Sequence, residues 1–323
     1  MARTILPVLA LLVTTANAAE PLHVRIDKII DAAQIGAPTQ IASDSAFVRR
    51  VYLNLTGVIP SSEEARRFLD DKSPNKRQKL IDQLLSSSRY VRHLSDSLNL
   101  MLMERRTNAA DWLAFLNSSV EQNKPWNQLA SEILGTDGTD AKTKGAMQFF
   151  TTRNVEANLM TRDIGRIFFG MDLECAQCHD HPRIDDYFQR DYYGIYAFLN
   201  RTYLFRPNKK KPAILAEKAV GNVNFKSVFT SVSGMTRPRL PGGIEIVEPT
   251  LKKGDEYKVK PNKKNKSIRP VPRFSRREQL QKLVLKGENP AFRRNIANRL
   301  WLHVMGRGIV HPPDLLHSEN PPS

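Results

Sequence analysis

The sequence predicts a mainly α-helical protein, a multi-helix orthogonal bundle that carries a small, loop-rich β insertion. Three observations support this fold class. Apolar residues recur at helical spacing over most of residues 24–200. Prolines and glycines become frequent between residues 201 and 274, where part of the chain alternates as a strand does. Helical spacing then returns from Ser275 to Gly306.

Start signals and apolar stripes place the helices of residues 24–200. A short helix is expected over residues 26–33, and Asp44 is expected to cap the next one. Pro60 followed by the acidic pair Glu63 and Glu64 is typical of another helix start. Apolar stripes predict further helices around residues 80–85, 91–103, 111–120, 126–134, 159–169 and 187–199.

The remaining chain is expected to contain strands and then two helices. Residues 223–232 read as a strand that pairs with residues 244–247. Ser275 or Arg276 starts a helix, and Pro290 starts the last one, because its fixed φ suits a first helical turn. The last residues, 311–323, hold four prolines and are expected to form no regular element.

The N-terminus has the layout of a secretory signal peptide. Arg3 precedes an apolar run from Ile5 to Val13, and the small residues of Ala16-Asn17-Ala18 follow as a cleavage site. The apolar run is too short to span a bilayer, and no later stretch is long enough, so no transmembrane segment is expected. We therefore exclude residues 1–18 from the fold and expect a periplasmic or extracellular protein.

Positive charge is concentrated in one part of the chain. The net charge is +16, and Arg201–Arg277 alone holds 20 Lys and Arg against 5 Asp and Glu, an excess of 15. Solvated loops are the simplest interpretation, and the alternatives are an anionic polysaccharide, an acidic redox partner or membrane headgroups. An exported protein seldom meets nucleic acid, so nucleic-acid binding is not expected.

The chemistry-bearing motif is Cys175-Ala-Gln-Cys178-His179, which contains the chain's only two cysteines. C-x-x-C-H is the spacing of c-type haem attachment, in which both thiols bond the haem and the histidine binds its iron. Cys175 and Cys178 would then hold the haem covalently, with His179 as the first axial ligand. The candidates for a second axial ligand are His181, Met147, Met160, Met171 and Met235.

Two other interpretations use the same residues. A non-haem divalent metal could be bound by the two cysteines, His179 and His181, with Asp180 and Asp185 nearby; a hydrolase centre would be the enzymatic version. Structural zinc normally takes two of its ligands from a distant segment. These ligands would have to be histidines, namely His93, His303 or His311. Alternatively, Cys175 and Cys178 form a disulfide, which leaves both histidines of the motif without a role.

Several ordered motifs resemble a known family. Val51–Gly57, Asn123-Lys-Pro-Trp126, the C-x-x-C-H motif with Pro182 and Asp191–Gly194 are similar to signatures of the planctomycete cytochrome-c-like domain family, a domain of unknown function. Asn289–Phe292, Asn298–Trp301 and Gly306–Gly308 resemble the start of the planctomycete-specific C-terminal domain that usually follows it. That second domain normally runs well beyond Ser323, so the chain resembles a truncated version of the pair.

The sequence thus predicts that the chain has four consecutive segments. They are a signal peptide at residues 1–18, a helical cytochrome-c-like domain at 24–200, a basic, partly β insertion at 201–274 and a truncated second helical domain at 275–323. The resemblance implies haem c, in agreement with the spacing of the motif. We expect an exported electron-transfer protein with a redox partner, and a redox role more than a hydrolytic one.

Overall fold

A computed structural model of the chain describes residues 20–34, 36–37 and 40–322. The predicted signal peptide lies outside these residues. The chain divides into a first unit, which ends at Phe47, and a compact second unit, residues 48–323. The first unit holds helix α1 (Leu22–Ala33) and the start of α2 (Asp44–Thr56). Ser43 Oγ accepts the Ala46 N–H at 3.3 Å, so the cap of α2 is one residue earlier than predicted.

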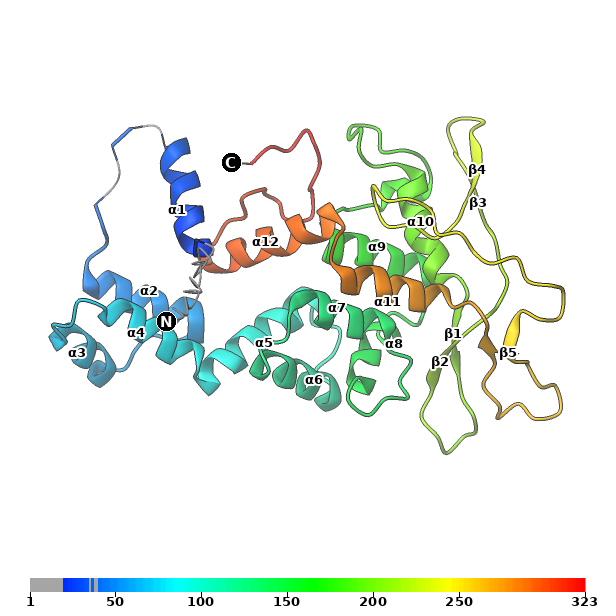
Figure 1. The fold of residues 1–323 in the computed structure, drawn as a ribbon, viewed down its shortest axis with the longest axis horizontal. Coiled ribbons are helices and arrows are strands. Elements are labelled where there is room, and N and C mark those ends of the chain that lie inside the picture. Colours follow the sequence, from blue (N-terminus) through cyan, green and yellow to red (C-terminus); the bar gives the residue numbers. More distant parts are fainter. Residues whose placement is uncertain (1–19, 35, 38–39, 323) are drawn as a thin grey trace, which may run out of the picture. The chain divides into compact units, whose positions relative to one another are not determined.

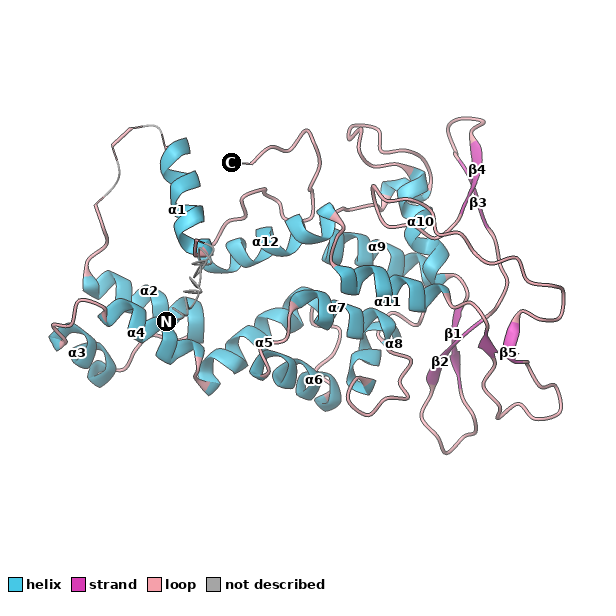
Figure 2. Cartoon of the chain, in the orientation of Figure 1, coloured by secondary structure: helices cyan, strands magenta, loops and turns pink. Residues whose placement is uncertain are grey.

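The second unit is built from helices, as Figure 1 and Figure 2 show. The predicted start after Pro60 is confirmed, since Ser61 caps α3 and exchanges reciprocal hydrogen bonds with Glu64. The other predicted helices are also present. The helices that precede the motif are α3 (Ser62–Asp70), α4 (Lys76–Leu85), α5 (Ser88–Met103), α6 (Ala110–Glu121), α7 (Trp126–Gly135), α8 (Gln148–Thr151) and α9 (Ala157–Phe169).

Helices α10 (Gln189–Leu199), α11 (Arg276–Lys286) and α12 (Pro290–Met305) complete the helical part. Helix α11 lies along α7 and α10, and α12 lies on α9, as Figure 1 shows. Stacked rings join these helices, because Trp126 packs between Phe168 of α9 and Phe292 of α12. One hydrophobic core therefore extends from α5 to α12. It includes Leu280 and Val284 of α11.

The segment between α10 and α11 contains all strands of the described residues (Figure 2). They form three separate antiparallel pairs. These are β1 (Thr202–Phe205) with β2 (Ile214–Glu217), β3 (Val223–Lys226) with β4 (Ser233–Thr236), and β5 (Tyr257–Val259) with β6 (Val271–Pro272). A mainly α-helical protein with a small β insertion is thus confirmed.

The predicted strand pairing is wrong in one place. Residues 223–232 are not one strand, since the chain turns after Lys226 and returns as β4. Residues 244–247 form no strand, and Ile246 instead donates its N–H to Pro238 O at 2.8 Å. A turn with polar side chains causes the difference, because Ser227 Oγ accepts the N–H groups of Phe229 and Thr230.

Among the residues described, no helix has both the length and the apolar character needed to cross a bilayer.

Candidate functional site

The C-x-x-C-H motif lies in a tight turn that follows α9. Gly170 ends α9 in the left-handed region at φ 69°, where a glycine has no steric penalty. Cys175–Gln177 then forms a single 3₁₀ turn. The N–H groups of Cys178 and His179 both donate to Cys175 O, at 3.1 and 3.3 Å. This turn points Ala176 into the core and leaves both cysteines exposed.

Helix α10 fixes the turn from one side. Tyr193 donates its hydroxyl hydrogen to Gln177 O at 2.9 Å, and the Gln189 N–H donates to Asp180 Oδ1 at 2.7 Å. Gln189 is the first residue of α10, so the Asp180 carboxylate accepts one of the helix's free N–H groups. Asp180, which the sequence offered as a nearby metal ligand, therefore anchors the motif to α10.

The hydrogen bonding of His179 leaves one ring nitrogen available. His179 Nδ1 lies 2.6 Å from Asp180 O. A carbonyl oxygen can only accept, so Nδ1 carries the hydrogen, and in a neutral ring the lone pair of Nε2 is then available to a metal. A backbone carbonyl that orients a histidine through Nδ1 is the usual outer partner of a metal-bound imidazole.

The loop between β3 and β4 covers the other side of the turn. Val228 donates its N–H to Cys178 O at 3.0 Å, and the Phe229 ring lies 4.6 Å from that of His179. Phe229 is 76% exposed, and Val228 and Val232 beside it are also exposed. His179 thus lies next to an aromatic ring that stays largely open to solvent. Phe229 was not predicted from the sequence, in which it stands out only as an aromatic residue within a polar turn.

His181, two residues further, is held by the loop itself. Its N–H donates to Tyr187 O at 2.8 Å, and its Nδ1 accepts the Arg183 N–H at 3.2 Å. Its ring meets the Tyr187 ring edge-on, and His317 lies on Tyr187 in the same way. Burial, followed by electrostatic interaction with the neighbouring His179 and His317, lowers the pKa of His181. These contacts give the residue a structural role in the turn after the motif.

The candidate methionines are placed in two different environments. Met147, Met160 and Met171 are buried members of the hydrophobic core. Met235 is 62% exposed on β4, where it pairs with Asn224. Side chains alternate along a strand, so Met235 lies on the hairpin face opposite Phe225, which stacks on Tyr193 of α10 at 5.1 Å. The structure therefore does not identify any of these four methionines as the second axial ligand.

The other ligands considered for a divalent metal are not assembled. In the part of the chain that the structure describes, no three His, Cys, Asp or Glu side chains are grouped as ligands of one ion. His93 and His303 lie against each other, with ring centroids 5.3 Å apart. Burial and the neighbouring His93 lower the pKa of His303. Cys175 and Cys178 are free thiols, so the structure contains no disulfide between them.

The basic insertion presents its lysines to solvent. The three Lys209–Lys211 residues and the three lysines of 263–266 are exposed, as the interpretation as solvated loops requires. Two arginines at the ends of this region, Arg201 and Arg276 of α11, behave differently. Arg276 is buried and pairs with Glu248, and Arg201 binds the same carboxylate at 3.1 Å. Lysines therefore supply the surface charge, while these arginines join the insertion to α11.

Comparison with known proteins identifies two regions of the chain. Residues 25–203 match the family PSCyt2, described as a protein of unknown function (DUF1549). Residues 276–323 match PSD1, also described as a protein of unknown function (DUF1553). No curated protein and no solved structure matches the chain. Since the first match covers more than half of its residues and includes the whole C-x-x-C-H turn, the chain belongs to the PSCyt2 family.

Proposed function

We propose that the chain carries one covalently attached c-type haem and transfers electrons outside the cytoplasm. Cys175 and Cys178 would form the two thioether bonds, and His179 Nε2 would bind the iron. A haem held in this way supplies one-electron chemistry whose potential depends on the second axial ligand and on exposure. Export is the prediction made from residues 1–18, and c-type haem is attached outside the cytoplasmic membrane in bacteria.

The observation that carries the proposal is the state of the donor atoms. Both thiols are free and exposed, so both can react. The hydrogen bond from His179 Nδ1 to Asp180 O leaves Nε2 to accept a metal. The exposed ring of Phe229 adds an apolar surface next to His179, and Val228 and Val232 of the same loop are exposed as well. An exposed apolar patch of this kind is typical of a ligand or partner site.

The alternative interpretations, a zinc site and a disulfide, fit the residues of the motif less well than haem does. A zinc site needs four converging ligands, which the described residues do not supply. A disulfide would use both sulfur atoms but would give no reason for the orientation of His179. A haem uses the two sulfur atoms and the free ring nitrogen together, and it requires only one further ligand or none.

The test is to produce the chain in a host with haem-maturation machinery and to record a pyridine haemochrome spectrum. We expect one covalent haem per chain, which stays with the polypeptide on a denaturing gel. Replacing both Cys175 and Cys178 by serine should abolish haem staining of that band, because each cysteine forms one thioether bond, and His179→Ala should change the spectrum of the native protein. His181→Ala is the matched control, because its ring is held by the loop, and it should keep the covalent haem.

Three results would overturn the proposal. The first is a colourless product with two titratable thiols, and the second is a product that contains stoichiometric zinc. The third is a covalent haem that remains after Cys175 and Cys178 are both replaced by serine, which would place the attachment elsewhere.

A further inference from the structure

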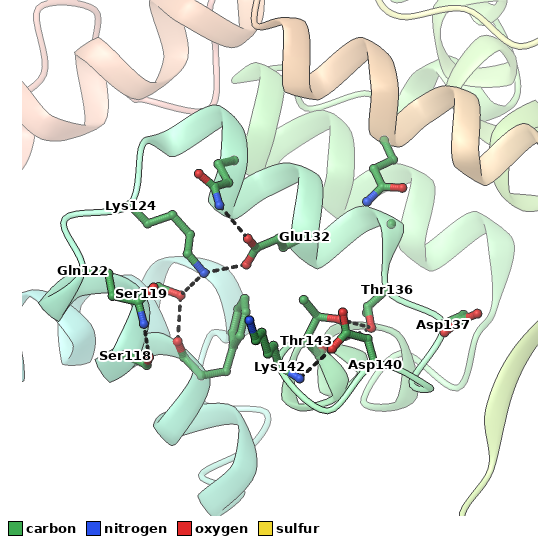
Figure 3. A pocket seen from close by; sticks show the side chains of 14 residues that line it. Ser118, Ser119, Gln122, Lys124, Glu132, Thr136, Asp137, Asp140, Lys142 and Thr143 are labelled. Atoms are coloured by element: carbon green, nitrogen blue, oxygen red, sulfur yellow. Dashed lines mark hydrogen bonds and ion pairs between the residues drawn. The ribbon is translucent and has the colours of Figure 1, made fainter.

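A second concave site lies away from the motif, between α6 and α7. Figure 3 shows this cavity, which has a volume of about 690 Å³ and includes no residue of the C-x-x-C-H turn or of α10. Its walls come from α6, α7 and the loop of residues 136–143, and α11 contributes Gln281. The volume lies within the range of small-molecule sites. Its lining is unusual for such a site, since it is dominated by hydroxyl, amide and charged groups. We refer to it as the polar cleft.

One wall of the polar cleft is a fixed network around Lys124. Its Nζ donates to Glu132 Oε2 at 2.6 Å and to Ser119 Oγ at 3.1 Å, and Gln128 Nε2 donates to Glu132 Oε1 at 3.0 Å. Lys124 Nζ also lies 5.2 Å from the centroid of the Phe115 ring. An ammonium group has three donors and an amide has both a donor pair and an acceptor. The network therefore retains unused donors on Lys124 and Gln128 and an unused acceptor on Gln128.

The facing wall is the loop of residues 136–143, which carries Asp137 and Asp140. Asp140 Oδ1 accepts the Lys142 N–H at 2.8 Å, and Thr136 donates its hydroxyl hydrogen to Thr143 O at 3.1 Å. Figure 3 shows this group apart from the Lys124 network. The Asp140 carboxylate keeps acceptor capacity, since a carboxylate can accept about four hydrogen bonds. Asp137 Oδ1, by contrast, already accepts the N–H and the hydroxyl hydrogen of Thr139.

The loop is held in place from outside the polar cleft. Asp137 O accepts the Leu215 N–H of β2 at 2.9 Å, and Asp137 Oδ2 accepts from Arg269 at 2.7 Å. Arg277 of α11, which is buried, donates to the carbonyl oxygens of Leu134 and Thr136. The polar groups are thus arranged before any ligand binds, which lowers the entropic cost of binding.

The side chain of Gln281 packs over Gly135 and adds one more polar group to the polar cleft. A Cβ atom at this position would lie 2.3–2.6 Å from the side chain of Gln281, so any larger residue would force that side chain to move. The Gln281 amide makes no hydrogen bond within the part of the chain that the structure describes. It is therefore available to a ligand at the edge of the polar cleft.

The chemistry of the lining points to the class of ligand. Two lysines and three carboxylates line the polar cleft, so it favours neither an anion nor a strongly cationic molecule. An apolar ligand would cover these polar groups without satisfying them, which costs free energy for each group. A hydroxyl group both donates and accepts, and several neighbouring hydroxyls match a lining of mixed donors and acceptors. We propose that the polar cleft binds a short, uncharged saccharide.

The proposal is tested by titrating the full chain with four uncharged trisaccharides: cellotriose, xylotriose, maltotriose and laminaritriose. Calorimetry or saturation-transfer NMR should show saturable binding of at least one of them, at micromolar to millimolar Kd. Digalacturonate is the charged comparison and should bind more weakly. The haem-free Cys175→Ser, Cys178→Ser double variant should bind equally well, so this result is separate from the haem proposal.

Two variants locate the binding site. Gln281→Ala removes a free amide, and Gly135→Ala displaces that amide by a steric clash, so each should weaken binding about 3- to 10-fold. Gln279→Ala is the matched control on the same helix, and it should leave Kd and the unfolding midpoint unchanged. The proposal is overturned if none of the four sugars binds saturably, if digalacturonate binds most tightly, or if both cleft variants bind like the unmodified chain.

Discussion

The C-x-x-C-H turn and the polar cleft are two surface sites of opposite character. In the turn, both thiols are free, and the nearest side chain of the β3–β4 loop, Phe229, is exposed. In the polar cleft, Lys124 and Glu132 are paired with each other and with neutral neighbours. The turn therefore contributes reactive groups that the fold does not need. The cleft contributes groups that the fold has already tied together.

Because of this difference, we expect substitutions in the two sites to affect the stability of the fold to different degrees. A residue whose side chain is free and exposed can be changed with little effect on folding, so its loss shows directly in the chemistry of the site. Substitution of a residue in a partly buried ion pair changes both the stability of the fold and the chemistry of the site, because it leaves the partner charge unpaired. Unfolding of the haem-free chain can therefore distinguish the two sites before any ligand is added.

The largest effect is expected for Lys124→Met. The side chains of Lys124 and Glu132 are 12% and 20% exposed, so the variant leaves the Glu132 carboxylate without its cation in a poorly solvated place. We expect a loss of about 2 kcal/mol in the free energy of unfolding, measured in urea. Lys282→Met breaks an exposed pair of the same length on α11 and should cost almost nothing. Cys178→Ser should also cost almost nothing, and a loss equal to that of Lys124→Met would contradict the comparison.

A smaller, pH-dependent effect is expected for Asp137→Asn. Burial raises the pKa of this carboxyl, but hydrogen bonds from Thr139 and Arg269 outweigh it, so the pKa is lowered in the folded chain. The resulting stability is present above the unfolded pKa of about 4 and is lost as pH falls through the lower folded value. Unfolding in urea should show a deficit of about 1 kcal/mol at pH 7 that narrows below pH 4. Asp185→Asn, at an exposed position, should show the same pH dependence as the unmodified chain.

The smallest effect on folding is expected for Phe229→Ala. Because the ring is 76% exposed, the haem-free variant should unfold within about 0.5 kcal/mol of the unmodified chain. The ring lies 4.6 Å from that of His179, so, if the chain carries the proposed haem, removal of the ring should expose the haem to water and lower the reduction potential, measured by redox titration. Ile244→Ala removes another highly exposed apolar side chain and should change neither quantity. An unchanged potential in Phe229→Ala would mean that this ring does not contact the haem.

The sequence was sufficient to predict the longer helices, because their apolar stripes and caps are local signals, but the single turn of α8 was not predicted. The start of α3 at Ser61 and the end of α9 at Gly170 are set by residues next to them. The β3–β4 hairpin was not predictable in this way. Its turn depends on Ser227, and alternation alone did not distinguish one long strand from two short ones.

The candidate site was predictable only where its residues are consecutive. Cys175, Cys178 and His179 stand together in the sequence, so their spacing identified them. Phe229 reaches His179 from 50 positions away, by way of a hairpin whose register the sequence did not reveal. The polar cleft was missed for the same reason. Its residues are ordinary ones from α6, α7 and a loop, and Gln281 joins them only because α11 packs along α7.

The packing of α11 and α12 has a consequence for how the chain can be divided. The region that matches PSCyt2 ends at residue 203, and the one that matches PSD1 begins at 276. Leu280, Val284 and Phe292 of the second region nevertheless belong to the same core as α7 and α9. The hydrophobic core therefore extends across the border between the two family matches. A polypeptide cut at residue 203 would expose the apolar sides of α7 and α9, so we expect it to be less stable than the whole chain.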